Sequence, residues 1–279
     1  MPIFLGKVSP WQRLHKFLWR QLPARSQQVA RLSVVIILGL LFLPFILVWW
    51  QPFIWLYALI SLVVINAIVW WWYWSGSHNL HSWLVSGSTF TIWQVSFFGW
   101  WFFLEGIPWR IIFLTLLAVI SFWYLWEWQR IAKKLVPLEV GAGAGPTLVV
   151  SFMAILALVS SAQFLLILFD WPVWLLLLIF FLPQVWLYAA WLKSNGWSLF
   201  NKWPVWLFGI VILLEIFFLV LWWPSGPAVA GFVSALTYLA ITATVRQEIQ
   251  GFVNLRAFRR EVILVLLLLA LVLLTARWL

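Results

Sequence analysis

Glu215 is the residue of this chain whose type and position could do chemistry. It lies near the centre of an apolar stretch, Pro204–Trp223, that reads PVWLFGIVILLEIFFLVLWW. A stretch of this length and composition is typical of a membrane-spanning helix. Placing an ionisable side chain inside such a helix costs free energy. We therefore take its presence as a hypothesis that the residue has a function. The chemistry that a carboxyl group at this depth could do is to relay a proton or to bind a small solute.

Four more polar side chains are predicted at a similar depth. Counted at about 1.5 Å per residue from the outer end of each predicted span, Glu215 lies about 12 Å down and the others roughly 13–20 Å down. They come from four further spans and are Asn66, Gln94, Ser160 and Gln184. One interpretation is a polar cavity around Glu215, and the other is hydrogen bonding that only packs helices together. We favour packing for the amides and Ser160, and give the two interpretations equal weight for Glu215.

The helices that would position these groups follow from the composition. Of 279 residues, 66% are hydrophobic and 9% are charged, whereas soluble domains have about 25% charged residues. We therefore predict an all-α, polytopic membrane helix bundle, with a basic segment over residues 1–31 and one transmembrane domain over residues 32–279. About nine transmembrane helices are expected: Leu32–Trp50, Phe53–Trp74, Trp83–Leu104, Pro108–Trp128, Pro146–Phe169, Pro172–Trp191, Pro204–Trp223, Gly226–Val245 and Val262–Leu279.

The basic residues predict the orientation of the bundle. With the N-terminus in the cytoplasm and the C-terminus outside, all of the 17 Lys and Arg residues except Arg110 and Arg277 lie in cytoplasmic segments. This distribution satisfies the positive-inside rule. It also supports Trp83–Leu104, the weakest predicted span, because its removal would invert the segments that follow. Short loops and the absence of cysteine fit a cell (cytoplasmic) membrane of the bacterial type.

The net charge of +10 indicates contact with lipid headgroups rather than with nucleic acid, because the charges lie in loops between spans. Residues 10–22 show the period of an amphipathic helix lying in the membrane interface. Anionic headgroups on the cytoplasmic side are the expected partners. The residues predicted to bind them are Arg13, Lys16 and Arg20 in this helix and Arg256, Arg259 and Arg260 in a later loop. The alternative is that these basic residues only set the topology, which we favour for the later loop but not for the helix.

Two other patterns carry less chemistry. Gly226, Ala230 and Ser234 recur at every fourth position, which is typical of a helix that packs closely, and we expect their helix to be central to the bundle. His78 and His81 could share a helix face, but a zinc site needs a third protein ligand, and no Cys or acidic residue is near in the sequence. No metal or cofactor is therefore predicted.

Three functions remain open. The first is a small-solute or proton-coupled carrier, based on Glu215 and the polar layer. The second is a non-catalytic membrane subunit or assembly partner of a larger complex, based on the missing catalytic motifs and the abundant apolar surface. The third is an intramembrane enzyme acting on a lipid, for which the sequence supplies only Glu215 and the interfacial histidines. The sequence favours a protein that is not an enzyme.

Overall fold

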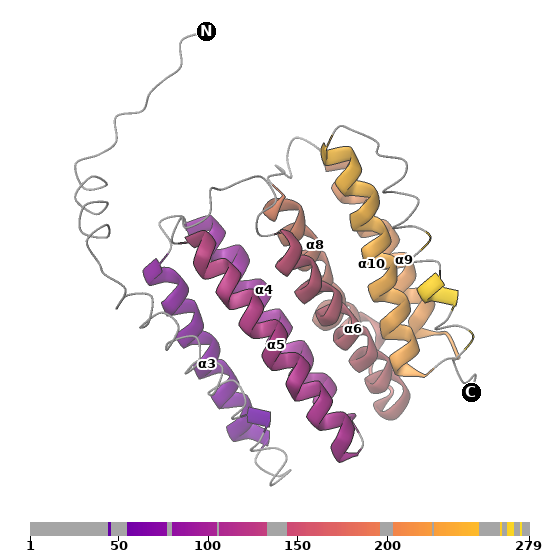
Figure 1. The fold of residues 1–279 in the computed structure, drawn as a ribbon. Helices are drawn as coiled ribbons and strands as arrows, with labels where there is room; N and C mark the ends of the chain where they lie inside the picture. The colour runs from indigo at the N-terminus through magenta and orange to yellow at the C-terminus, as the bar shows by residue number, and fades with distance from the viewer. Residues whose placement is uncertain are drawn as a thin grey trace, which may run out of the picture.

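The computed structural model is a bundle of roughly parallel and antiparallel helices (Figure 1). It describes residues 44–45, 55–76, 80–104, 106–132, 144–195, 203–224, 226–250, 263, 267–270 and 274, and no strand occurs among them. The helices of this part of the chain are α3 (Trp55–Gly76), α4 (Leu80–Trp101), α5 (Ile107–Ala132), α6 (Ala144–Phe169), α7 (Val173–Leu176), the π-helical segment η2 (Leu177–Phe181), α8 (Leu182–Ser194), α9 (Trp203–Leu221) and α10 (Pro227–Gln250).

Five of the described helical segments are long and apolar enough to cross a membrane. They are Ile107–Trp128, Gly145–Phe169, Val173–Ser194, Trp203–Leu221 and Pro227–Arg246. Each begins within a residue or two of the span expected from the sequence, and prolines lie at or next to their first turns, where a missing N–H costs no hydrogen bond. These helices indicate a membrane protein. The first and last predicted spans lie almost wholly outside the described residues.

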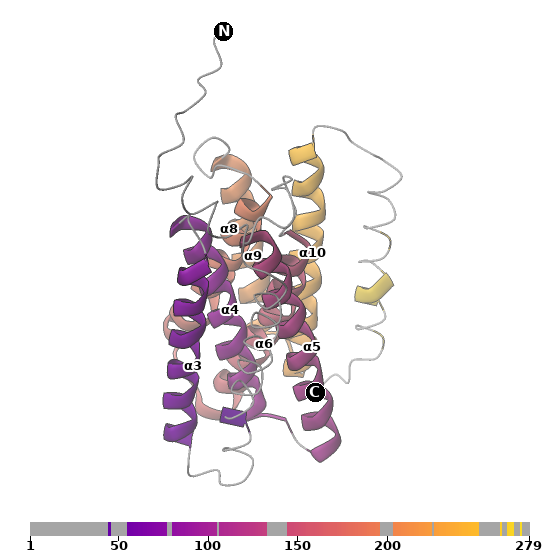
Figure 2. The ribbon, with the colours of Figure 1, turned by 60° about the vertical axis from the view of Figure 1, so that its left-hand side comes forward.

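The expected weak span is the helix α4, which has 22 residues. At about 1.5 Å per residue it is about 33 Å long, enough to cross a bilayer. Its Ser and Thr residues keep it out of the five most apolar segments, yet it lies inside the bundle against α6 (Figure 2). The structure therefore gives the polar residues of α4 neighbours other than lipid.

The central helix is α6, which packs against α10, α4, α8, α5 and α9. Its residues 154–163 are buried without a break, so this part of the helix is covered on all sides. The predicted span Gly226–Val245, which was expected to be the central packing helix, corresponds to α10, and the central position belongs to α6 instead. Helix α10 is the most extensive neighbour of α6, but it packs against fewer helices.

Gly231 explains why α6 and α10 lie so close together. A Cβ atom built on Gly231 would contact the Ser160 hydroxyl and would lie 2.5 Å from the Leu156 carbonyl oxygen. Tyr238, two turns further along α10, lies beside Ser151, two to three turns back along α6. Residue numbers thus run in opposite directions across the contact, and the two helices are antiparallel.

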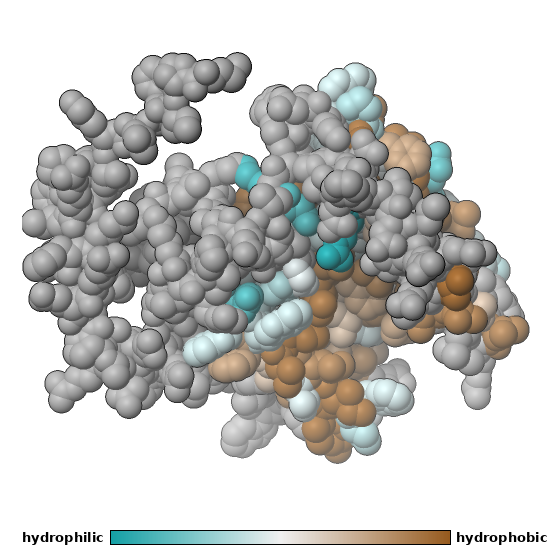
Figure 3. Space-filling model, turned by 45° about the horizontal axis from the view of Figure 1, so that its top comes forward, coloured by the Kyte–Doolittle hydropathy of each residue, from teal (hydrophilic) through white to brown (hydrophobic). Residues whose placement is uncertain are grey.

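The outer surface of the described bundle is largely apolar. Figure 3 shows hydrophobic residues covering much of the visible part that is not grey. Exposed apolar side chains include Val119 on α5, Leu178 in η2 and Phe208 on α9. Lipid tails are the natural surroundings for such a surface.

Candidate functional site

Helix α4 receives tryptophan side chains from the helices on either side of it. The indole N–H of Trp70 on α3 donates to the Thr91 hydroxyl (2.8 Å), and that of Trp186 on α8 donates to the Ser88 hydroxyl (2.7 Å). Each hydroxyl in turn donates to a carbonyl one turn back in α4. The Ser and Thr residues that weakened the prediction of this span are therefore acceptors for interhelical hydrogen bonds.

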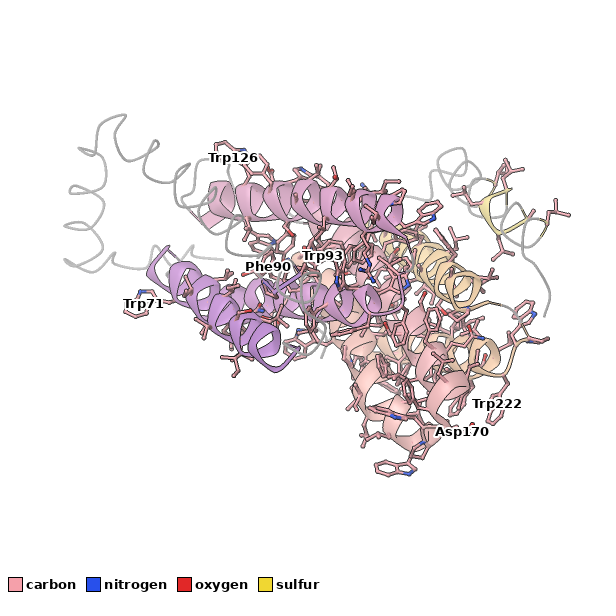
Figure 4. The ribbon with its side chains drawn as sticks, turned by 90° about the horizontal axis from the view of Figure 1, so that it is seen from below. Trp71, Phe90, Trp93, Trp126, Asp170 and Trp222 are labelled. Carbon is pink, nitrogen blue, oxygen red and sulfur yellow. The ribbon has the colours of Figure 1, made fainter. Side chains whose placement is uncertain are left out.

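Gln94 belongs to a hydrogen-bonded cluster between α4 and α5. Its amide nitrogen donates to the Ser121 hydroxyl (3.1 Å), which also accepts the indole N–H of Trp93 (2.9 Å). All three side chains are buried. Figure 4 shows Trp93 and the neighbouring Phe90 between the two helices. One hydroxyl thus satisfies two buried donors, which joins α4 to α5.

Gln184 lies just after an irregular part of its helix. The segment Leu177–Phe181 is π-helical, and Pro183 follows it in the first turn of α8. Proline has no N–H and crowds the carbonyl four residues back, which a local change in helix winding relieves. The Gln184 amide donates to the Phe180 carbonyl (3.1 Å), so the side chain satisfies a backbone acceptor within the irregular segment.

Asn66 and Ser160 are also buried, but in different surroundings. The Asn66 amide donates to the Leu62 carbonyl of its own helix α3 (2.9 Å). The Ser160 hydroxyl faces Gly231 on α10. Asn66, Gln94, Ser160 and Gln184 thus lie at four separate places, and no hydrogen bond joins any of the four to another within the described residues.

Glu215 lies on the opposite side of α9 from the bundle. The residues of α9 that are buried are Gly209, Leu213, Phe217, Val220 and Leu221, whereas Glu215 is exposed. At about 100° per residue, Glu215 is rotated by about 190° from the centre of that buried face. The described residues offer its carboxyl group no hydrogen-bond or ion-pair partner, and the structure does not bring it together with the four buried polar residues.

The inner face of α9 is held by two close contacts. Gly209 lies against the ring of Tyr188 on α8, where an added Cβ atom would be 2.5 Å from the ring. Phe217 packs against Phe181 with ring centroids 5.7 Å apart. These contacts fix the rotation of α9 about its axis, so the outward position of Glu215 follows from them.

Gln163 on α6 has a role that the sequence did not reveal. Its amide nitrogen donates to the Val220 carbonyl (3.2 Å) and to the Trp223 carbonyl (3.1 Å). The last carbonyls of a helix have no partner within the helix, so this buried side chain caps the end of α9. The pairing joins residues almost 60 positions apart in the sequence, and no local pattern indicates it.

A line of buried hydroxyl groups lies between α6 and α10. The Ser160 and Ser234 hydroxyls are buried with no hydrogen-bond partner among the described residues, and Ser151 is buried as well. Tyr238 lies beside Ser151 and packs edge-on against Tyr188, with ring centroids 6.4 Å apart.

The predicted headgroup-binding residues, Arg13, Lys16, Arg20, Arg256, Arg259 and Arg260, lie outside the described residues, as does His78. Within the described part of the chain, no three His, Cys, Asp or Glu residues gather as metal ligands.

Comparisons of this chain with models of protein families, with curated proteins and with solved structures found no match.

Proposed function

We propose that this protein is a non-catalytic membrane subunit that holds another membrane protein against the outer face of α9. The observation that supports this proposal is the outward position of Glu215 on a helix whose other face is packed on the bundle. Acidic residues within membrane spans almost always face a bundle interior or a water-filled cavity, or pair with another group. Since the described bundle supplies no such partner, a second protein is the source that we favour.

The arrangement in the membrane is part of the same proposal. We propose nine spans in a cell (cytoplasmic) membrane, with the N-terminus in the cytoplasm and the C-terminus outside, because this arrangement places the basic loops on the cytoplasmic side. The basic N-terminal segment and the loop with Arg256, Arg259 and Arg260 would then contact anionic headgroups.

A photo-reactive amino acid placed on α9 in cells tests the proposed function. Val211 and Leu219 flank Glu215 on the exposed side of the helix. Val119 on α5 is a matched control, because it is exposed and the nearest charged residue of its helix, Glu127, is eight residues away. We expect a discrete protein-sized adduct from positions 211 and 219 and lipid adducts alone from position 119. Lipid adducts alone at all three positions would refute the proposed function.

A small-solute carrier is the second proposal, and the buried hydroxyl line between α6 and α10 supports it. Ser234 lies in that line, and the chain has no cysteine, so Ser234→Cys creates a single thiol. Modification by a water-soluble maleimide would indicate an aqueous path between the helices. If Ser194→Cys at the end of α8 reacts and Ser234→Cys does not, the line is dry and this second proposal fails.

A further inference from the structure

The exposed side of α9 has the pattern of a helix-packing surface with one carboxyl group at its centre. We define the α9 outer stripe as Phe208, Val211, Glu215, Leu219 and Trp222. Spacings of 3, 4 and 4 residues keep the first four on one side of α9, and Trp222 directly follows Leu221, the last residue of the helix. All five are exposed, with Phe208 at 58% and Trp222 at 69%. Figure 4 shows Trp222 projecting from the edge of the bundle.

The central position of Glu215 separates this stripe from an ordinary lipid-facing surface. Glu215 is the only polar residue in a stripe that is otherwise aromatic and aliphatic. A single polar residue at the centre of an apolar packing stripe specifies the register and the identity of the partner helix, as a buried polar residue does in a coiled coil. The stripe is therefore suited to a partner that places a complementary group at one depth.

The charged residues of the described spans indicate the chemistry of this complementary group. Among the described residues of the spans, the basic side chains lie near helix ends. Arg110 is held there by the Leu104 carbonyl (3.1 Å) and the Trp101 ring, and Lys193 and Arg246 close α8 and the apolar part of α10. None of them lies at the middle of a span. The described part of the chain thus holds a mid-depth acid without a mid-depth base.

We infer that the α9 outer stripe binds a transmembrane helix of another protein that carries one Lys or Arg side chain at the depth of Glu215. This inference rests on the proposed function and adds the chemistry of the partner. A second copy of this chain suits the stripe less well, because a two-fold pairing through α9 would place two Glu215 carboxyl groups against each other. An opposite charge at the same depth binds the carboxyl group and removes both charges from lipid.

The experiment uses the purified full chain in lipid nanodiscs and fluorescent Leu/Ala probe helices of about 21 residues. One probe carries Lys at the depth of Glu215, a second carries Leu there, and a third carries Lys seven residues away. Energy transfer to a dye on the protein reports association. Hydrogen bonds and charge pairs within membranes lead us to expect roughly 3- to 30-fold tighter association of the first probe than of the second. Glu215→Gln should abolish the preference for Lys.

A relocated carboxyl group gives a control that does not depend on a loss of binding. Phe208 lies seven residues, or two turns, from Glu215 on the same stripe. In the double variant Phe208→Glu/Glu215→Leu, the preference should move to the third probe. This gain of binding also shows that the variant is folded.

Several outcomes would overturn the inference. Equal association of the Lys and Leu probes would overturn it. If positions 211 and 219 still gave a protein adduct, the proposed function would stand and only the chemistry of the partner would be wrong. A second copy of this chain would be the occupant if differently labelled copies showed energy transfer and Glu215→Gln abolished it. That result would also overturn the inference. An adduct from position 211 or 219 within one chain would show that another segment of this protein covers the stripe, and would overturn both proposals.

Discussion

Replacing Gly231 tests the packing of the two central helices. In Gly231→Ala the new methyl group would lie 2.5 Å from the Leu156 carbonyl oxygen, and ordinary contact begins near 3.4 Å, so α6 and α10 must separate by about 0.9 Å along this line. The Leu156 oxygen belongs to the backbone of α6 within residues 154–163, which are buried without a break, so it has little freedom to move.

The cost of this separation can be compared with the gain in helix propensity. Overpacking a close-packed interior lowers the free energy of unfolding by about 1–3 kcal/mol. Replacing Gly by Ala within a helix raises it by up to about 1 kcal/mol. We therefore expect the free energy of unfolding to fall by about 1 kcal/mol in Gly231→Ala and by about 2–3 kcal/mol in Gly231→Val. Titration with sodium dodecyl sulfate in mixed micelles, followed by circular dichroism, measures this difference.

Gly145 supplies the matched control for this comparison. It lies in the first turn of α6, and a Cβ atom there would meet nothing within 4 Å. Gly145→Ala should leave the free energy of unfolding unchanged or raise it slightly. If Gly231→Ala were as stable as Gly145→Ala, the close contact of α6 and α10 would be disproved. If Ser160→Ala restored the stability of Gly231→Ala, the hydroxyl rather than the Leu156 backbone would limit the approach.

Substitutions at three further positions test hydrogen bonds and backbone strain. Ser121→Ala should lower the free energy of unfolding by about 1–3 kcal/mol, because it leaves the buried Trp93 and Gln94 donors without their acceptor. Gln163→Leu should expose the last carbonyls of α9, so amide hydrogen exchange should become faster at that end of the helix and not at its beginning. Asp170 directly follows α6 and has φ 50°, a left-handed conformation that favours glycine, so Asp170→Gly should raise the melting temperature and Asp170→Val should lower it.

The exposed Thr115 on α5 is a control for Ser121. Its hydroxyl donates only to the Ile111 carbonyl of its own helix, so Thr115→Ala should change the free energy of unfolding by less than about 0.5 kcal/mol. A loss at Thr115 as large as that at Ser121 would contradict the role of the α4–α5 cluster. For Gln163→Leu, unchanged exchange at the end of α9 would contradict the cap. Equal melting temperatures for Asp170→Gly and Asp170→Val would contradict backbone strain at that position.

Most helix positions in the described part of the chain could be predicted from the sequence. Length, apolar composition and prolines at helix starts locate a span within a few residues, as they did for α9 and α10. The charge distribution also required the helix α4, which apolar composition alone left in doubt. These signals are local, so a single sequence contains them.

The rotation of each helix about its axis could not be predicted, and the candidate site depends on it. In a soluble protein the polar face of a helix marks the side turned to solvent. In α9 both faces are apolar, because Phe217 meets protein and Phe208 meets the outside of the bundle. The predicted depth in the membrane placed Glu215 in one layer with Gln94 and Gln184. Depth does not report whether a side chain points into the bundle or away from it. Packing of Gly209 on a ring from another helix sets that direction, and no sequence pattern reports it.

The central position of α6 has a consequence for the order of synthesis. Helix α4 precedes α6 in the chain, whereas 57 residues separate Phe169 from Pro227, the first residue of α10. At about 5–20 residues per second, the ribosome takes roughly 3–11 s to make that stretch. During this interval Ser151 and Ser160 have no α10 to cover them. The side of α6 that α10 covers in the finished bundle is therefore made seconds before the helix that covers it.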